Sequence, residues 1–331
     1  MSLAGVNYIN IALMVLSMTA AFVVPFELFL FSYAVLGPAH YLTEISWLHD
    51  RQYFTRRKTD YLWLLACCVG VFMGSSYVLG SGLYVPALYA ISTELIIAAF
   101  GIALIVVLFN NWPSRGIAAV LLVVGILLFR SERWVDLVFA IYLPTLIHVF
   151  IFTGAFLLLG ALKSHSKSGY VAFGVFIISA LVCLLVSPGY QAEAGAYVRD
   201  SYRDFSILSV RLIQDLGMGT VSQFRDIYES DAGQAAMRFI AFAYTYHYLN
   251  WFSKTSVIKW HEVPRSRFLA VGLIWAASLG IYAYDYSLGL RWLFFLSFAH
   301  VLLEFPLNHQ SFIGIGRSVR ERIRSPAPMT A

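Results

Sequence analysis

The stretch WVDLVFAIYLPTLIHVFIFTGAFLLLGA, residues 134–161, decides the class of fold. It contains one charged side chain, Asp136, and one histidine, His148, in a run that is otherwise almost entirely apolar. A helix of about 20 apolar residues crosses the hydrocarbon core of a bilayer, which is about 30 Å thick. This stretch is therefore long enough to cross a membrane as a helix.

Similar apolar stretches occupy most of the remaining chain. Of the 331 residues, 60% are hydrophobic and 12% are charged, whereas a soluble domain is roughly half apolar and a quarter charged. The mean hydropathy of +0.72 excludes a soluble enzyme. The sequence predicts an all-α, polytopic transmembrane helix bundle of about ten spans, with eight or nine as alternatives. These spans are 6–24, 25–48, 61–80, 88–110, 116–130, 134–161, 170–188, 235–254, 268–285 and 289–309.

The distribution of arginine and lysine predicts the orientation of the chain, because cytoplasmic loops carry the excess of positive charge. Most of the 23 basic residues follow spans two, four, six and eight or lie in the tail. Both termini are therefore expected in the cytoplasm. We expect residues 1–310 to form a single transmembrane domain and residues 311–331 to form a basic, partly disordered tail.

The long polar segment 189–234 falls on the opposite side of the membrane. It contains apolar residues such as Phe205, Leu208 and Ile213 in a mostly polar setting, which predicts an amphipathic helix on the outer face. The first span lacks a basic n-region and a cleavage site, so it is expected to be retained, and we favour a bacterial inner membrane as the location. The net charge of +5 lies in short blocks rather than in a stripe, so no nucleic-acid partner is expected.

Ionisable side chains at membrane depth are costly, and their default interpretation is functional. Two segments repeat the pattern A-H-x-L-x-E-x4-H, the first with His40 and Glu44 and the second with His300 and Glu304. Residues four apart share one face of a helix, so each segment projects an imidazole and a carboxylate together. His49 and His309, at the ends of the two patterns, fall half a turn away and are expected near helix ends.

Four histidines, each on a different span, are expected at a similar depth. They are His40, His148, His247 and His300. Imidazole is a good ligand for iron, copper, zinc and nickel, and bundles build metal centres from side chains on separate helices. We predict a site for one or two transition-metal ions, most consistent with Fe(II). Each histidine taken alone is equally consistent with hydrogen bonding between helices.

The two carboxylates have three possible roles at this site. Glu44 and Glu304, the candidate catalytic residues, are expected to be direct metal ligands, bridges between two metals, or acceptors that fix the histidine tautomers. On the eighth span, Tyr244, Asn250 and Trp251 are candidates for supporting the ligands or contacting a substrate. An interfacial aromatic belt is the alternative for Trp251 and Tyr248. Glu94 and Asp136 are candidates for a proton path or an interhelical pair.

The order of these motifs resembles a known family. Gly37-Pro-Ala-His40-x3-Glu44, Ile147-His148-Val-Phe, Tyr246-His247-Tyr-Leu and Ala299-His300-x3-Glu304 together resemble the motifs of the bacterial membrane β-carotene dioxygenases of the Brp/Blh type. The resemblance implies that the four histidines bind non-haem iron. This chain departs from that family in having Glu where the family has Asp and in the spacing of the first and last motifs.

We therefore expect a membrane metalloenzyme, an iron-dependent oxygenase or oxidase that uses O₂ and takes a lipophilic, carotenoid-like substrate from the surrounding membrane lipids. The first alternative is a transporter coupled to protons or to a metal ion, because buried histidine and carboxylate pairs also relay protons. The second alternative is a haem b protein with histidine axial ligands. A retinal Schiff base is excluded because no lysine lies deep in a span.

Overall fold

The computed structural model describes residues 2–254 and 263–324. Within these ranges every regular element is helical, in agreement with the predicted all-α class. Six helices are long and apolar enough to cross a membrane, which indicates a multi-pass membrane protein. They are Leu3–Val23, Trp112–Phe129, Arg133–Ser164, Lys167–Leu185, Arg265–Tyr284 and Tyr286–Arg324.

Each of the ten predicted apolar segments lies on helical structure, but not all of them form membrane-length helices. The helices α4 (Tyr61–Gly74) and α6 (Ser92–Leu108) are apolar and shorter. The second segment comprises α2 (Pro25–Phe31), a π-helical turn η1 (Ser32–Leu36) and α3 (Gly37–Asp50). Pro25 begins α2 because its ring is accommodated at a first helical position and because it lacks the N–H that a continuing helix would need.

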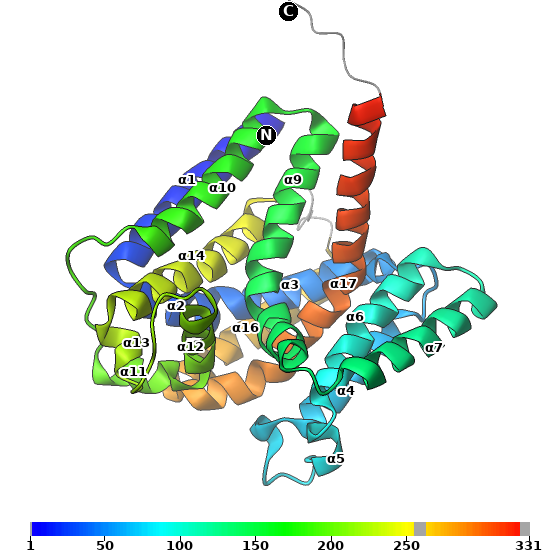
Figure 1. The fold of residues 1–331 in the computed structure, drawn as a ribbon, viewed down its shortest axis with the longest axis horizontal. Coiled ribbons are helices and arrows are strands. Elements are labelled where there is room, and N and C mark those ends of the chain that lie inside the picture. Colours follow the sequence, from blue (N-terminus) through cyan, green and yellow to red (C-terminus); the bar gives the residue numbers. More distant parts are fainter. Residues whose placement is uncertain (1, 255–262, 325–331) are drawn as a thin grey trace, which may run out of the picture. The chain divides into compact units, whose positions relative to one another are not determined.

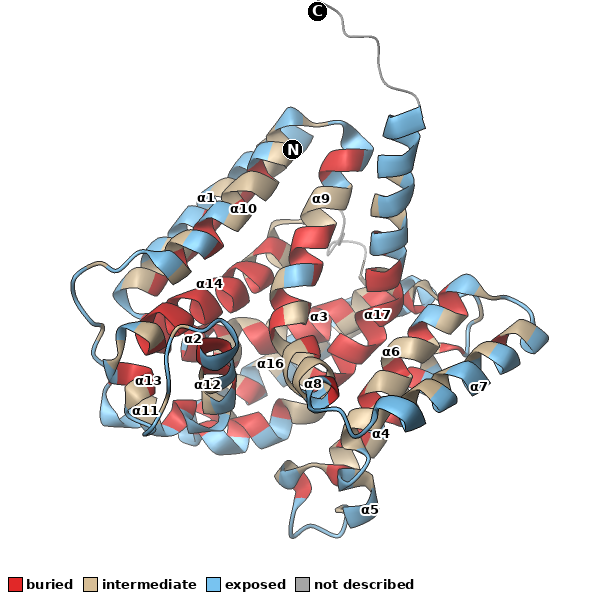
Figure 2. Ribbon diagram, in the orientation of Figure 1, coloured by how far each residue is buried: buried red, intermediate tan, exposed pale blue. Residues whose placement is uncertain are grey.

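The chain divides into two compact units, residues 1–43 with 171–293 and residues 44–170 with 294–331. In the first unit, α14 (Asp231–Ser253) is the central helix. It packs against α1 (Leu3–Val23), against α2 and against α12 (Ser206–Asp215), and the paired course of α1 and α14 is visible in Figure 1. Nearly all its side chains from Gly233 to Tyr248 are buried (Figure 2). A helix that carries apolar or small side chains on all of its faces is buried on every face.

The remaining helices of the first unit are α10 (Lys167–Leu185), α11 (Ala196–Tyr202), α13 (Asp226–Glu229), α16 (Arg265–Tyr284) and the start of α17 (Tyr286–Arg324). The predicted amphipathic helix in segment 189–234 is present as α12. Its buried face contains Leu208, Leu212 and Ile213 and packs on α14. This apolar face is therefore covered by protein.

The second unit has an apolar core formed by α4, α6, the end of α3 and the middle of α17. Leu48, Cys68, Ala103, Leu302 and Phe305 are buried in this core. Helix α7 (Trp112–Phe129) packs on α6, and α8 (Arg133–Val135), the π-helix η4 (Asp136–Phe152) and α9 (Thr153–Ser164) complete the unit. Two short elements, η3 (Ser76–Val78) and α5 (Pro86–Tyr89), connect α4 to α6.

The outer face of α7 is strongly apolar and open. Ile117, Leu121 and Leu128 are each at least 66% exposed, and Figure 2 shows much of this helix as exposed. Soluble monomers rarely expose contiguous apolar patches larger than a few hundred Å². Contact with lipid tails accounts for this face.

The basic part of the tail is helical. Helix α17 continues to Arg324 and so includes residues 311–324. Arginines at the end of this helix, including Arg322 and Arg324, lie near the helix C-terminus, where positive charge is favourable. The predicted disordered end, residues 325–331, lies outside the described residues, as does Lys259.

Candidate metal centre

The first unit contributes one buried pair of histidines. His40 lies in the first turn of α3 and His247 lies near the end of α14, and both are almost inaccessible to solvent. Their Nε2 atoms are 3.1 Å apart. The planes of the two rings meet at an angle of 78°, so the rings approach each other through their nitrogen atoms and are not stacked.

Aromatic side chains of the same unit hold His40 in place. The Trp251 ring lies 5.5 Å from the His40 ring, and its Nε1–H donates to Thr43 Oγ1 over 3.0 Å. Tyr248 lies 5.2 Å from His40 and shares a hydrogen bond of 2.9 Å with Tyr41 between the two hydroxyl groups. Packing and hydrogen bonds of this kind restrict the orientation of a ligand imidazole.

The second unit contributes the other pair, with a carboxylate attached. His148 on η4 and His300 on α17 are both buried, and their Nε2 atoms are 3.2 Å apart. Glu304 Oε2 lies 3.2 Å from His148 Nδ1 and accepts a hydrogen bond from Asn308 Nδ2 over 3.3 Å. A carboxylate close to the Nδ1 atom of a histidine commonly orients the ring of a metal ligand.

Two of the four histidines lie on or directly after π-helical turns. His148 lies inside η4, which also contains Pro144, and His40 follows η1 by one turn. Proline cannot donate the backbone hydrogen bond of an α-helix, so the chain around Pro144 departs from regular α-helical geometry. π-Helical turns are rare and occur frequently at functional sites.

His40, His148, His247 and His300 form a buried four-histidine cluster that could hold a transition metal. The ligand nitrogens that they offer all lie within 4.8 Å of one another. The sequence predicted this grouping from the depth of the four residues, and that coarse prediction is confirmed.

The spacing inside each pair fits metal ligands. Two nitrogens bound to one metal at about 2.1 Å are about 3.0 Å apart at a right angle and about 3.4 Å apart at the tetrahedral angle. The observed 3.1 and 3.2 Å fall in this interval. Axial nitrogens on opposite sides of a haem iron would be roughly 4 Å apart, with the macrocycle between them, so neither pair fits a haem.

The carboxylates and supporting residues differ in what they touch. Glu304 is buried, and its Oε2 lies beside Nδ1 of His148. Glu44 is buried one turn after His40 on α3, as the spacing predicted. Tyr244 is buried one turn before Tyr248, and the centres of the two rings are 6.2 Å apart. Asn250 is buried three residues after His247, and its Oδ1 finds no hydrogen-bond partner among the described residues.

The structure differs from the expectation for His309 and distinguishes between the alternatives for other outlying residues. His309 is in the middle of α17 rather than near a helix end, and its Nε2 donates to the Phe100 carbonyl over 2.9 Å. Tyr248 is buried in the first unit, so the interfacial belt is the wrong interpretation for it. Asp136 accepts from Thr93 Oγ1, while Glu94 lies 3.9 Å from Arg130. The last two contacts favour interhelical pairing over a proton path.

Sequence reasoning did not identify Asn308 as a partner of the carboxylate. Its signal was available, because His300, Glu304 and Asn308 follow one another at intervals of four and share a helix face. The sequence alone does not show that Asn308 contacts Glu304, so an asparagine two turns from His300 did not indicate a role at the site. The roles of Thr43 and Tyr41 were also unpredicted, since they depend on contacts with α14.

Comparisons with known protein families, with curated proteins and with solved structures find no match to this chain.

Proposed function

We propose that this membrane protein is a metalloprotein in which His40, His148, His247 and His300 bind one transition-metal ion. The observation that carries the proposal is the burial of four imidazoles whose nitrogens group within 4.8 Å. Burying four polar rings in an apolar region is costly unless their nitrogens are satisfied. A cation shared by the four lone pairs satisfies them together.

The proposed ion is Fe(II), bound through Nε2 of each ring. The donor set consists of imidazole nitrogens without thiolate, and such a set suits iron as well as copper, zinc and nickel. The resemblance of the histidine motifs to membrane β-carotene dioxygenases favours iron among these. The proposed role of Glu304, whose Oε2 lies 3.2 Å from His148 Nδ1, is to favour the tautomer of His148 in which Nε2 is free to bind the ion.

The proposed activity is oxidative cleavage of a carbon–carbon double bond in a lipophilic, isoprenoid-like substrate. Both oxygen atoms of O₂ enter the products, so that one C=C bond becomes two C=O bonds and no other electron donor is required. The metal would supply the binding and activation of O₂. The indole ring of Trp251, which is partly exposed beside His40, offers an apolar surface to such a substrate.

Metal analysis of the purified full-length protein tests the proposed centre. We expect about one transition-metal ion per chain, and we expect loss of the ion in both His40→Ala/His247→Ala and His148→Ala/His300→Ala. His49→Ala is the matched control, because His49 is an exposed histidine on the same helix as His40. Retention of half of the metal in either double variant would indicate two separate sites and contradict the single centre.

Folding and activity are measured on the same samples. Gel-filtration elution and helical circular dichroism show whether each variant is folded, so that loss of metal is not confused with loss of structure. Folded wild-type protein that binds no transition metal, even when supplied with iron without oxygen, would overturn the proposal. The activity is tested with ¹⁸O₂ and a carotenoid, and both labelled atoms are expected in the carbonyl products.

A proton- or metal-coupled transporter is the second candidate function, and one observation favours it. Glu44 and Glu304 are buried beside histidines on helices that contribute to the cluster. Buried carboxylate and histidine pairs relay protons in transporters. Metal uptake into proteoliposomes that is lost in Glu44→Gln, without any oxidation of substrate, would favour this candidate.

A further inference from the structure

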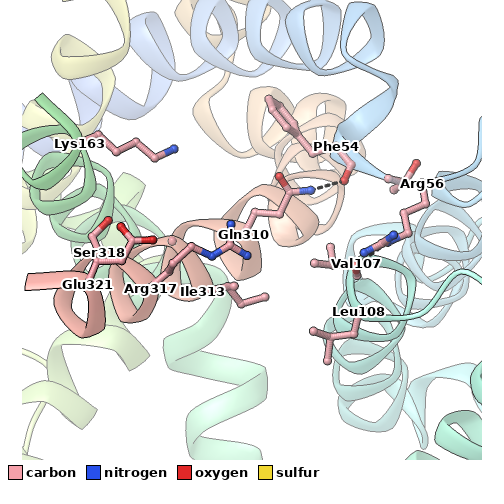
Figure 3. Close-up of a pocket in the computed structure, with 12 residues that line it drawn as sticks. Phe54, Arg56, Val107, Leu108, Lys163, Gln310, Ile313, Arg317, Ser318 and Glu321 are labelled. Atoms are coloured by element: carbon pink, nitrogen blue, oxygen red, sulfur yellow. Dashed lines mark hydrogen bonds between the residues drawn. The ribbon is translucent and has the colours of Figure 1, made fainter. Parts of the chain in front are cut away.

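A pocket of about 650 Å³ lies in the second unit, apart from the histidines. It is bounded by the loop after α3, the C-terminal end of α6, the end of α9 and the C-terminal half of α17. Figure 3 shows Arg56 and Arg317 approaching this pocket from opposite walls. The four segments are distant in sequence, so the pocket is a product of the folded unit.

The pocket carries an excess of positive charge. Arg56, Lys163 and Arg317 line it, with Glu321 as the acidic lining residue. All four side chains are exposed. Within the part of the chain that the structure describes, no carboxylate lies within ion-pair distance of the three basic groups. Their charge is therefore available to an anion.

Hydrogen bonds between segments fix the walls of the pocket. Arg56 Nε donates to the Val107 carbonyl over 2.9 Å, at the end of α6. Gln310 Nε2 on α17 donates to the Phe54 carbonyl over 2.6 Å, a bond drawn in Figure 3. Because the loop is attached both to α6 and to α17, the basic groups are held around a defined space.

Part of the lining is apolar. Leu108 and Ile313 are more than one-third exposed, and Val107, in the last turn of α6, is a further apolar lining residue. A pocket with cationic groups beside exposed aliphatic side chains matches a molecule that has an anionic head and a hydrocarbon chain. A free anion would use only the first of these features.

The position of the pocket agrees with such a ligand. Its basic residues come from three segments that the charge distribution assigns to the cytoplasmic side, and that leaflet carries anionic lipids. Arginine binds phosphate oxygens well because its planar guanidinium presents several N–H groups. The lining residues at the end of α6 lie where an apolar helix meets a polar loop.

We propose that this pocket binds the phosphate headgroup of an anionic phospholipid, with Arg56, Lys163 and Arg317 around the phosphate. The acyl chains leave along Leu108 and Ile313. The site is independent of the histidine cluster, so it does not depend on the proposed metal function.

A thermal-shift titration of the full-length protein in a neutral detergent tests this site. The probes are dioctanoyl phosphatidylglycerol, dioctanoyl phosphatidylcholine and inorganic phosphate. We expect saturable stabilisation by the anionic lipid and little by the other two. Arg317→Ala is expected to raise the apparent Kd for the anionic lipid about five- to tenfold.

Two further variants keep the test independent of folding. Glu321→Gln removes the negative charge from the lining and is expected to lower the Kd about two- to fivefold, a gain that a damaged protein would not show. Arg320→Ala is the control, because Arg320 is an exposed arginine of the same helix that does not line the pocket. Equal weakening by Arg320→Ala and Arg317→Ala would overturn the site. Equal stabilisation by inorganic phosphate or by phosphatidylcholine would overturn the assignment to an anionic lipid.

Discussion

Glu304 is a buried carboxylate beside His148, one of the four histidines proposed to bind the metal. It lies 3.2 Å from His148 Nδ1 and is itself hydrogen-bonded to Asn308. Outer partners of this kind commonly change metal affinity by about 10- to 100-fold when removed. We therefore expect this carboxylate to contribute to the affinity of the proposed metal centre.

We expect Glu304→Gln to weaken metal binding about 10- to 100-fold, because a neutral amide stabilises the Nδ1 proton of His148 less than a carboxylate does. Competition with a chelator of known affinity measures the change. Glu94→Gln is the control, since Glu94 is a partly exposed carboxylate beside Arg130. Unchanged affinity in folded Glu304→Gln would show that the contact with His148 is not needed for metal binding.

Arg115 and Asp60 form a buried ion pair in the second unit. Two guanidinium nitrogens donate to the two carboxylate oxygens over 2.7 and 2.9 Å, and both side chains are buried. Arg115→Met leaves a buried carboxylate without its cation, so the free energy of unfolding should fall by about 3–5 kcal/mol. Arg130→Met, at the other end of α7, should cost less than about 1 kcal/mol, because Arg130 is exposed. Denaturant unfolding in detergent distinguishes the two variants.

Close packing around the central helix α14 leaves no room for a side chain at Gly233. A Cβ atom there would lie 2.3 Å from the Ile227 carbonyl oxygen. We expect Gly233→Ala to lower the unfolding temperature, because the backbone of α13 must move away. Gly125→Ala on α7 is the matched control, since nothing lies within 4 Å of its Cβ. It should instead stabilise the helix by about 0.5–1 kcal/mol. Equal effects of the two substitutions would contradict the proposed packing of α13 on α14.

The short helix α13 provides a pH-dependent prediction outside the membrane spans. Asp226 accepts hydrogen bonds from the backbone N–H groups of Gln223 and Ser222, which lowers the pKa of its carboxyl below the ordinary 3.8. A lowered pKa in the folded state means that the contribution to stability is present above the unfolded pKa and lost as pH falls through the folded pKa. Hydrogen exchange of these two amides, corrected for intrinsic rates, should lose protection below about pH 4. Protection that is the same in Asp226→Asn at all pH values would contradict this role.

At the scale of the whole molecule, the sequence predicted the helical elements better than their lengths and contacts. Apolar runs locate helices because burial and lipid contact both require them. The shortness of α4 and α6 and the continuation of α17 to Arg324 depend on neighbouring contacts that a hydropathy pattern does not contain. The four histidines were predictable because polar rings in apolar runs are rare, whereas Asn308 and Thr43 became recognisable only through their partners.

The number of spans gives the last prediction, because each added or missing span reverses the side of every later loop. In a background with Cys67, Cys68 and Cys183 replaced by alanine, single cysteines are introduced as Lys58→Cys, Ser81→Cys, His165→Cys and Thr220→Cys. With ten spans, a membrane-impermeant thiol reagent applied outside intact cells should label Ser81→Cys and Thr220→Cys, and the other two only after lysis. If residues 116–130 do not cross the membrane, His165→Cys becomes accessible from outside and Thr220→Cys does not. In that case Lys163 would lie on the opposite side from Arg56, although both line one pocket. The shared pocket therefore favours the arrangement in which 116–130 crosses the membrane.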